Sequence, residues 1–247
     1  MQADPADQLR LLDLQQLDSS LVRLAQRRRT LPEIAERTAL AVRRRELTDA
    51  GVLARTELAD LHHRSTRLEG DIDQVRSRAD RDRQRLASGA VSAPRELTEL
   101  QSEIESLGRR QTALEDDELE LMELMEGVDA RVSAAAGDLA AVEAQEADAE
   151  RRQGEAEAAI DADAAFARAG REQLAPQLPE ALVALYEQVR KASDGVGAAA
   201  LHVRRCQGCH LELAGSELAA ARGAAPTEVL RCENCRRILI RTPESGL

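Results

Sequence analysis

The fold of this chain is limited above all by a ladder of apolar residues, spaced three and four apart, between positions 97 and 160. This spacing places the side chains on one face of a helix, and a face that continues for about nine heptads is typical of a coiled coil. The sequence therefore predicts a long helix that pairs along its length with another. Nearly all positions of the ladder are apolar: Leu97, Leu100, Ile104, Leu107, Gln111, Leu114, Glu118, Leu121, Met125, Val128, Val132, Ala135, Leu139, Val142, Glu146, Ala149, Gln153, Ala156 and Ile160.

Two shorter ladders in the N-terminal part are out of phase with each other. Pro32 lies inside the first ladder. Because proline lacks an amide donor and clashes with the preceding helical turn, we predict a kink or short break near residue 32. The first ladder contains Leu14, Leu17, Leu21, Leu24, Leu31, Ala35 and Val42, and the second contains Leu47, Ala54, Leu58, Leu61, Leu68, Ile72, Val75, Ala79 and Leu86.

The segment between these ladders and the long one contains residues that stop a helix and reverse its direction. Gly89 and Pro94 both lie there. The predicted fold class is mainly α, with a long antiparallel coiled-coil helical hairpin over residues 1–175 that turns at 87–94. Near its end the second arm becomes rich in alanine, at residues 156–165, where we expect the helices to approach closely and to bury little surface.

Prolines end the second arm. Pro176 and Pro179 interrupt the helical pattern, and the segment 176–195 is predicted to contain a short amphipathic helix, Glu180–Ala192, followed by a glycine-containing linker. We expect this helix to pack against the base of the hairpin near residues 9–17.

The composition also favours long paired helices, which bury apolar side chains along the line of contact between them, over a compact globular core. Tyr186 and Phe166 are the only aromatic residues, and charged residues make up 32% of the chain. Residues 1–94 carry 17 basic and 15 acidic side chains, whereas residues 95–195 carry 10 and 25. The arms therefore attract each other better than the acidic arm attracts its own copy, which predicts a monomer or weak homodimer. The acidic arm is a poor surface for nucleic acid.

The chain has no apparent membrane segment. No stretch approaches the roughly 18 apolar residues of a membrane span, and Met1–Pro5 is acidic and starts no apolar run. We therefore expect a cytoplasmic protein without a membrane partner. In that reducing compartment closely spaced cysteines are expected to be metal ligands rather than disulfides.

Two Cys-x-x-Cys pairs carry the recognisable chemistry of this sequence. Cys206 and Cys209 form the first pair, Cys232 and Cys235 form the second, and 22 residues separate the pairs. Each pair places two sulfurs on one side of a tight loop, and two such loops complete a four-sulfur site. The sequence predicts one structural Zn²⁺ in a C4 zinc ribbon over residues 196–247.

The residues around the cysteines fit a small β module. Strands are predicted over Ala198–Arg205, Glu228–Arg231 and Ile238–Arg241, and Gly208 is expected to let the backbone curl around the ion. Since the block has few apolar residues, metal ligation, which contributes roughly 10 kcal/mol or more in small modules, is expected to hold it together. Four thiolates leave no open coordination position, so we expect no enzymatic activity.

Other assignments of the cysteines are less consistent with the sequence. Cys206 to His210 spells the haem-attachment pattern, but that would require export and would leave Cys232 and Cys235 without a role. A thioredoxin-like redox pair lacks its βαβ context. His210 could replace one cysteine as a ligand, although a surface or packing role beside a complete site is the simpler interpretation.

Arginines surround the predicted zinc site. They could provide solubility and neutralise the negative charge of a zinc tetrathiolate, or they could contact RNA, DNA or an acidic protein. The ribbon has no aromatic residue on which a base could stack, which weighs against single-stranded nucleic acid. The candidate contact residues are Arg204, Arg205, Arg231, Arg236, Arg237 and Arg241.

The sequence resembles a bacterial family of coiled-coil proteins with a C-terminal four-cysteine zinc ribbon. The resemblance rests on the segments 88–97, 100–104, 114–116 and 121–123 of the hairpin and on residues 206–210 and 232–239 of the ribbon. It implies a long antiparallel hairpin and zinc ligands at the four cysteines. Family members in flagellated bacteria resemble chaperones that hold an alternative sigma factor and connect to the flagellar export apparatus, and RNA binding has been proposed among them.

Two functional hypotheses follow. The first is a non-enzymatic adaptor or chaperone-like protein that docks an unidentified protein partner, in a transcription-related role, through its coiled coil and its ribbon. The second is binding of RNA or DNA through the arginine-rich ribbon.

Overall fold

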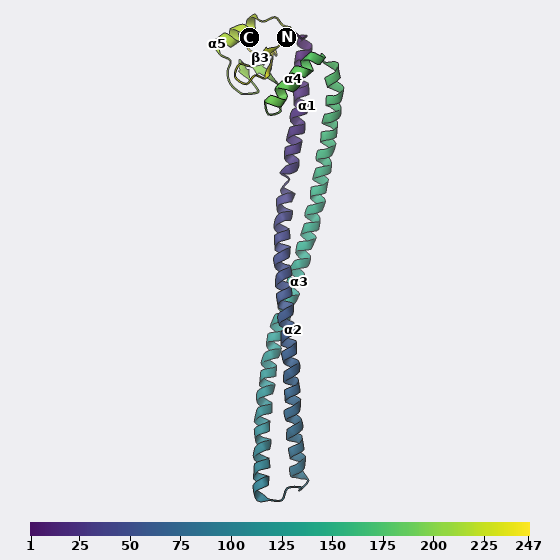
Figure 1. Ribbon diagram of the computed structural model, residues 1–247, viewed down its shortest axis with the longest axis vertical. Helices are drawn as coiled ribbons and strands as arrows, with labels where there is room; N and C mark the ends of the chain where they lie inside the picture. Colours follow the sequence, from purple (N-terminus) through teal and green to yellow (C-terminus); the bar gives the residue numbers. More distant parts are fainter. The chain divides into compact units, whose positions relative to one another are not determined.

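The computed structural model describes residues 1–247 and divides into two compact units (Figure 1). The first unit contains Met1–Ala35 and Glu150–Leu247, and the second contains Glu36–Ala149. None of the helices combines the length and the apolarity that crossing a bilayer requires. The elements in chain order are α1 (Pro5–Arg29), α2 (Pro32–Ala87), α3 (Pro94–Leu174), η1 (Ala175–Gln177), α4 (Glu180–Ala192), β1 (Ala198–His202), β2 (Arg205–Cys206), α5 (Gly215–Gly223), β3 (Leu230–Arg231) and β4 (Ile238–Ile240).

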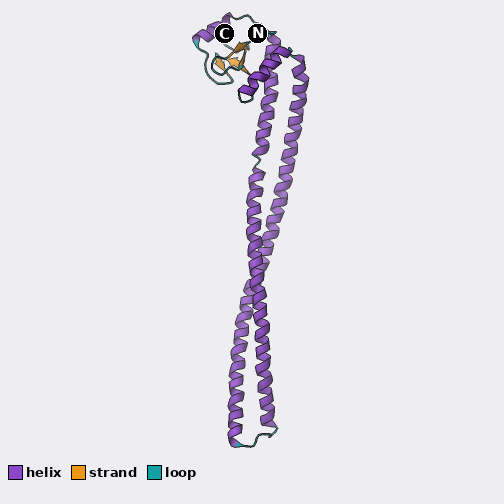
Figure 2. Ribbon diagram, in the orientation of Figure 1, coloured by secondary structure: helices purple, strands orange, loops and turns teal.

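The predicted fold class is confirmed: long helices form a hairpin, and strands occur only in the C-terminal segment (Figure 2). α1 begins after Asp4, whose side chain accepts a hydrogen bond from the Ala6 amide at 2.8 Å and so caps the helix. The helix break expected near residue 32 lies at Thr30 and Leu31, directly before the proline that starts α2.

The first apolar ladder does not continue through this break, contrary to the sequence analysis. Leu31 is buried, but Ala35 is exposed and Val42 is 57% exposed. The partly covered positions after the break are instead Glu33, Arg37 and Leu40, and the next buried position is Leu47. The two ladders differ in phase because the break rotates the start of α2 relative to the end of α1.

In the second unit the seam keeps a seven-residue period. On α3 the buried positions Leu114, Leu121 and Val128 are each seven residues apart, and Val142 and Ala149 continue the same period. The facing positions on α2 are Leu47, Gly51, Ala54, Leu61, Ile72 and Ala79.

Two ion pairs between the helices of the second unit follow the charge difference between the arms. Arg44 of α2 pairs with Glu146 of α3 at 3.1 Å, and Arg78 of α2 pairs with Glu103 of α3 at 2.7 Å. A third pair has the opposite sense, because its cation, Arg131, lies on α3 and its anion, Glu57, on α2. Beyond α2 the chain reverses through Gly89, which has a positive φ of 70° that glycine adopts without strain.

In the first unit the short helix α4 packs on α1, as predicted. Leu11 and Leu14 of α1 share a buried cluster with Leu182, Tyr186 and Val189 of α4. The strand residues Ala198, Ile238 and Ile240 of the ribbon belong to the same cluster. The ribbon is therefore packed directly against the base of the hairpin.

The ribbon contains a four-stranded sheet in the order β2-β1-β4-β3, in which only the β1–β4 pair is parallel. The strands are shorter than predicted, and the predicted strand from Ala198 to Arg205 is divided between β1 and β2. α5, which the sequence analysis missed, lies between the two cysteine pairs.

The N-terminal residues extend the ribbon. Gln2 forms a β-bridge with Glu228, and the Ala3 amide donates to the Thr227 carbonyl at 2.8 Å. The first residues of the chain are thus joined through backbone hydrogen bonds to the segment that precedes β3.

Candidate metal centre and the helix base that holds it

The structure brings the four predicted ligand cysteines together. All four sulfurs lie within 4.8 Å of one another, with 3.8 Å between Cys206 and Cys235 and 3.9 Å between Cys209 and Cys232. Zinc–sulfur bonds of about 2.3 Å in a tetrahedron place neighbouring sulfurs about 3.8 Å apart. The donor set and its spacing therefore fit one zinc ion.

The two cysteine loops have the same backbone geometry. In the first, the His210 amide donates to the Cys206 carbonyl at 2.8 Å, and in the second the Arg236 amide donates to the Cys232 carbonyl at 2.8 Å. His210 and Arg236 both have positive φ, of 61° and 63°. The residue after each pair thus turns the chain back and leaves both sulfurs of the pair on the inside.

This geometry corrects the role expected for Gly208, which does not adopt a positive φ. A Cβ at this position would lie 2.7 Å from Cδ of Arg237 and 3.0 Å from Cβ of Ala199. Glycine is required because a side chain and a strand approach the loop closely, whereas the left-handed conformation occurs at His210 and Arg236.

The pKa values of three of the cysteine thiols are shifted, and not all in the same direction. Burial raises the pKa of the Cys206 thiol to about 12 and also raises the pKa of Cys232. The pKa of Cys235 is lowered: burial opposes ionisation there, but hydrogen bonds from the Arg237 amide and neighbouring thiols outweigh it. Zinc must displace protons from the buried thiols, so its affinity decreases as the pH falls.

Glu217 of α5 is a supporting residue that the sequence analysis missed. Its side chain is 94% buried, with 6% exposure, and its Oε1 accepts a hydrogen bond from the Glu233 amide, inside the second cysteine loop, at 2.9 Å. Its Oε2 has no partner. The carboxylate therefore fixes the loop between Cys232 and Cys235. An isolated glutamate on an unrecognised helix gave no signal in the sequence.

Two of the six arginines proposed as contact residues are used inside the ribbon. Arg237 donates to the carbonyls of Gly208, Val196 and Ser193, at 3.0, 3.2 and 3.2 Å. Arg241 donates to four carbonyls between residues 224 and 228. We assign both to internal bracing rather than to a contact surface.

The other four candidates remain exposed. Arg204, Arg205, Arg231 and Arg236 lie on the surface of the ribbon, and Arg231 also donates to the Arg236 carbonyl at 2.8 Å. His210 is exposed as well and is not part of the four-sulfur cluster.

A buried glutamine joins α1 to the linker that leads into the ribbon. Oε1 of Gln15 accepts from the amide of Gly197 at 2.6 Å, and its Nε2 donates to the carbonyl of Gly195 at 3.1 Å. A Cβ on Gly197 would lie 2.7 Å from both the ring and the carbonyl oxygen of Tyr186. The linker glycines are therefore held in place by α1 and α4.

Asp18 completes this base. It is 3% exposed and accepts hydrogen bonds from the Tyr186 hydroxyl and from Nε of Arg171, both at 2.7 Å. Burial, together with the hydrogen bond to Asp18, raises the pKa of Tyr186 above its ordinary value. One buried carboxylate thus links α1, α3 and α4 beneath the ribbon.

Comparisons with known proteins agree with both parts of the fold. Residues 14–194 match the CT398-like coiled coil hairpin domain, and residues 205–239 match the C4-type zinc ribbon domain. The uncharacterized protein Rv2229c of Mycobacterium tuberculosis is 39% identical over 241 residues, which cover 98% of each chain. A solved Mycobacterium smegmatis structure matches with a TM-score of 0.82 and 33% identity over 98% of this chain and 100% of that one. CT398 from Chlamydia trachomatis matches with a TM-score of 0.66 at 19% identity, over 96% of this chain and 98% of that one, and so has the same fold.

Proposed function

The chain belongs to the CT398-like coiled coil hairpin family, and we propose that it is a non-enzymatic adaptor or chaperone-like protein that docks a protein partner through its hairpin and its zinc ribbon. The observation that carries this proposal is the packing of the ribbon on the hairpin base, in one cluster with α1 and α4. A zinc module fixed in this way presents a rigid surface, and a rigid surface binds with a smaller entropic cost than a mobile one.

The chemistry of the metal site is consistent with a structural role. The sulfurs of Cys206, Cys209, Cys232 and Cys235 would fill every position of a tetrahedral zinc ion, which would leave water or substrate no place to bind the metal. We propose that the docked partner is a transcription-related protein.

Affinity capture with the full chain tests this function. The tag belongs after Leu247, because the Met1 carbonyl accepts a hydrogen bond from the Val229 amide at 3.1 Å. We expect the intact chain to recover a protein partner that Cys209→Ser and Cys235→Ser chains recover poorly. Recovery of no protein above background by the intact chain would contradict the proposal.

Binding of nucleic acid is a second candidate function, favoured by the four exposed arginines on the ribbon. Arg205→Ala and Arg236→Ala should each weaken binding of an RNA or DNA oligonucleotide. Each should also reduce the slope of log K against log salt concentration by about one, as the loss of one phosphate contact does. Fluorescence anisotropy at low salt measures this, and absence of binding there would eliminate the candidate.

A further inference from the structure

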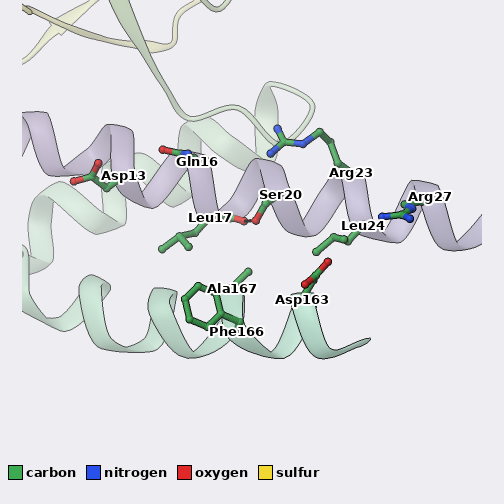
Figure 3. A pocket seen from close by; sticks show the side chains of 10 residues that line it. All are labelled: Asp13, Gln16, Leu17, Ser20, Arg23, Leu24, Arg27, Asp163, Phe166 and Ala167. Atoms are coloured by element: carbon green, nitrogen blue, oxygen red, sulfur yellow. Dashed lines mark hydrogen bonds between the residues drawn. The ribbon is translucent and has the colours of Figure 1, made fainter. Parts of the chain in front are cut away.

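A groove of about 720 Å³ lies between α1 and α3 in the unit formed by residues 1–35 and 150–247. Figure 3 shows Leu17 and Leu24 projecting from α1 toward α3, and Phe166 projecting from α3 toward α1. We call this feature the base groove.

The groove forms because α3 is rich in alanine here. Ala164 and Ala167 are buried, but their methyl groups are too small to fill the space opposite Leu17 and Leu24, which remain only partly buried. We expected the alanines of residues 156–165 to allow close helix approach and to bury little surface, and the groove lies directly beyond them, at Phe166 and Ala167. The apolar surface of this segment is therefore incompletely covered within the chain.

Phe166 is the most informative residue of the groove. It is the chain's only phenylalanine, and it is 81% exposed. A single exposed apolar side chain needs no explanation, but this one adjoins the partly covered Leu17 and Leu24. Leu17, Leu24 and Phe166 together thus form a small exposed apolar patch along the groove.

Four charged side chains line the groove: Asp13, Arg23 and Arg27 on α1 and Asp163 on α3. None of the four forms an ion pair, whereas Arg28, next to Arg27 in sequence, pairs with Asp161 at 2.6 Å. Arg23 and Arg27 lie one turn apart and Asp13 lies at the other end of the α1 lining. The Arg23–Arg27 end of the α1 side thus presents two unpaired positive charges beside the apolar surface.

We propose that the base groove binds an amphipathic helix of a partner protein, with its apolar face on Leu17, Leu24 and Phe166 and an acidic flank against Arg23 and Arg27. This mode of recognition places side chains at i, i+3 or i+4, and i+7 into a groove. The lining of α1 from Asp13 to Arg27 is about 21 Å long, which corresponds to about four turns of the partner helix.

A second copy of the chain suits the groove less well. Each copy carries a net charge of -11, so two copies repel each other. The inference rests on the proposed docking function and specifies the site and the chemistry of the partner.

Designed peptides test this site on the full chain. The probes are helical peptides of about 14 residues with leucines at i, i+3, i+7 and i+10, one with glutamates on the flank, one with lysines there, and one scrambled. Fluorescence anisotropy should show that the glutamate peptide binds about tenfold or more tightly than the other two. Phe166→Ala should weaken binding of the glutamate peptide by about tenfold. The double variant Arg23→Glu with Arg27→Glu should bind the lysine peptide more tightly than the glutamate peptide. Leu124→Ala, at an exposed apolar position in the other unit, should have no effect.

Four results would overturn the inference. Absence of binding by all peptides is one, and an unchanged preference in the charge-reversed chain is another. The third is a wild-type dimer that Phe166→Asp dissociates, because a second copy would then fill the groove. If the Phe166→Asp chain still captures the partner of the intact chain, the docking function stands and the base groove is not its site.

Discussion

Gly197 is the residue at which the ribbon, α1 and α4 are tied together. Its amide donates to Gln15, and a Cβ on it would meet the ring and the carbonyl oxygen of Tyr186, both at 2.7 Å. Gly197→Ala should lower the free energy of unfolding of this unit by about 1–3 kcal/mol, because the added methyl would meet backbone atoms that cannot move freely. Urea unfolding followed by the fluorescence of Tyr186, the only tyrosine, reports on this unit.

Gly154 provides the matched control in the same unit. A Cβ there would meet nothing within 4 Å, and the residue lies inside α3. Gly154→Ala should raise stability by about 0.5–1 kcal/mol, since alanine loses less backbone entropy in a helix. Equal effects of the two substitutions would contradict the packing described for Gly197.

Glu217 is expected to influence zinc binding without touching the metal. Glu217→Ala removes the acceptor of the Glu233 amide and should lower the zinc affinity of the full chain by about tenfold to a hundredfold, as loss of outer-shell partners does. Glu217→Gln keeps an acceptor oxygen and should recover most of this loss. Competition with a chromogenic chelator measures both.

Glu233→Ala is the control for Glu217, because it removes an exposed side chain and keeps the backbone amide. It should leave zinc affinity nearly unchanged. A Glu217→Ala chain with parental affinity would show that the carboxylate does not position the loop.

At the scale of elements, the heptad seam of α2 and α3 makes a direct stability prediction. Leu121 is 5% exposed and packs in a cluster with Leu61 and Val128, whereas Leu119, two residues away, is 60% exposed. Leu121→Ala should cost about 2–5 kcal/mol and Leu119→Ala less than about 0.5 kcal/mol. Urea unfolding followed by far-ultraviolet circular dichroism separates them, and similar losses would contradict the seam.

The elements also show what the sequence could predict. The hairpin and α4 were predictable because helical periodicity is local and because Pro32, Gly89 and Pro94 act on their own neighbours. α5 was missed because a helix as short as this one depends on contacts with distant residues, which the local sequence does not show. The first apolar ladder was extended too far because the spacing of apolar residues does not show how much a break rotates the next helix.

At the scale of the whole molecule, the cysteine constellation was predictable from its spacing, but its support was not. Gln15 meets Gly197 across 182 residues of sequence, and no local pattern distinguishes it from a surface glutamine. Arg237 and Arg241 look like a basic patch in the sequence, yet both hold backbone carbonyls. Long-range polar contacts of this kind become visible only in three dimensions.

The same contacts change the expected result of metal removal. The sequence alone predicted that the ribbon would lose its shape while the hairpin persisted. Because Ala198, Ile238 and Ile240 share a cluster with α1 and α4, loss of zinc should also loosen α4 and the beginning of α1. Residues 36–149, which form a separate unit, should be unaffected.

Amide hydrogen exchange of the full chain, with zinc bound and after chelation, tests whether the metal holds the ribbon on the helix base. We expect protection to be lost in β1, β4 and α4 and retained in residues 36–149. Unchanged protection of β1 and β4 after complete removal of zinc would contradict the account.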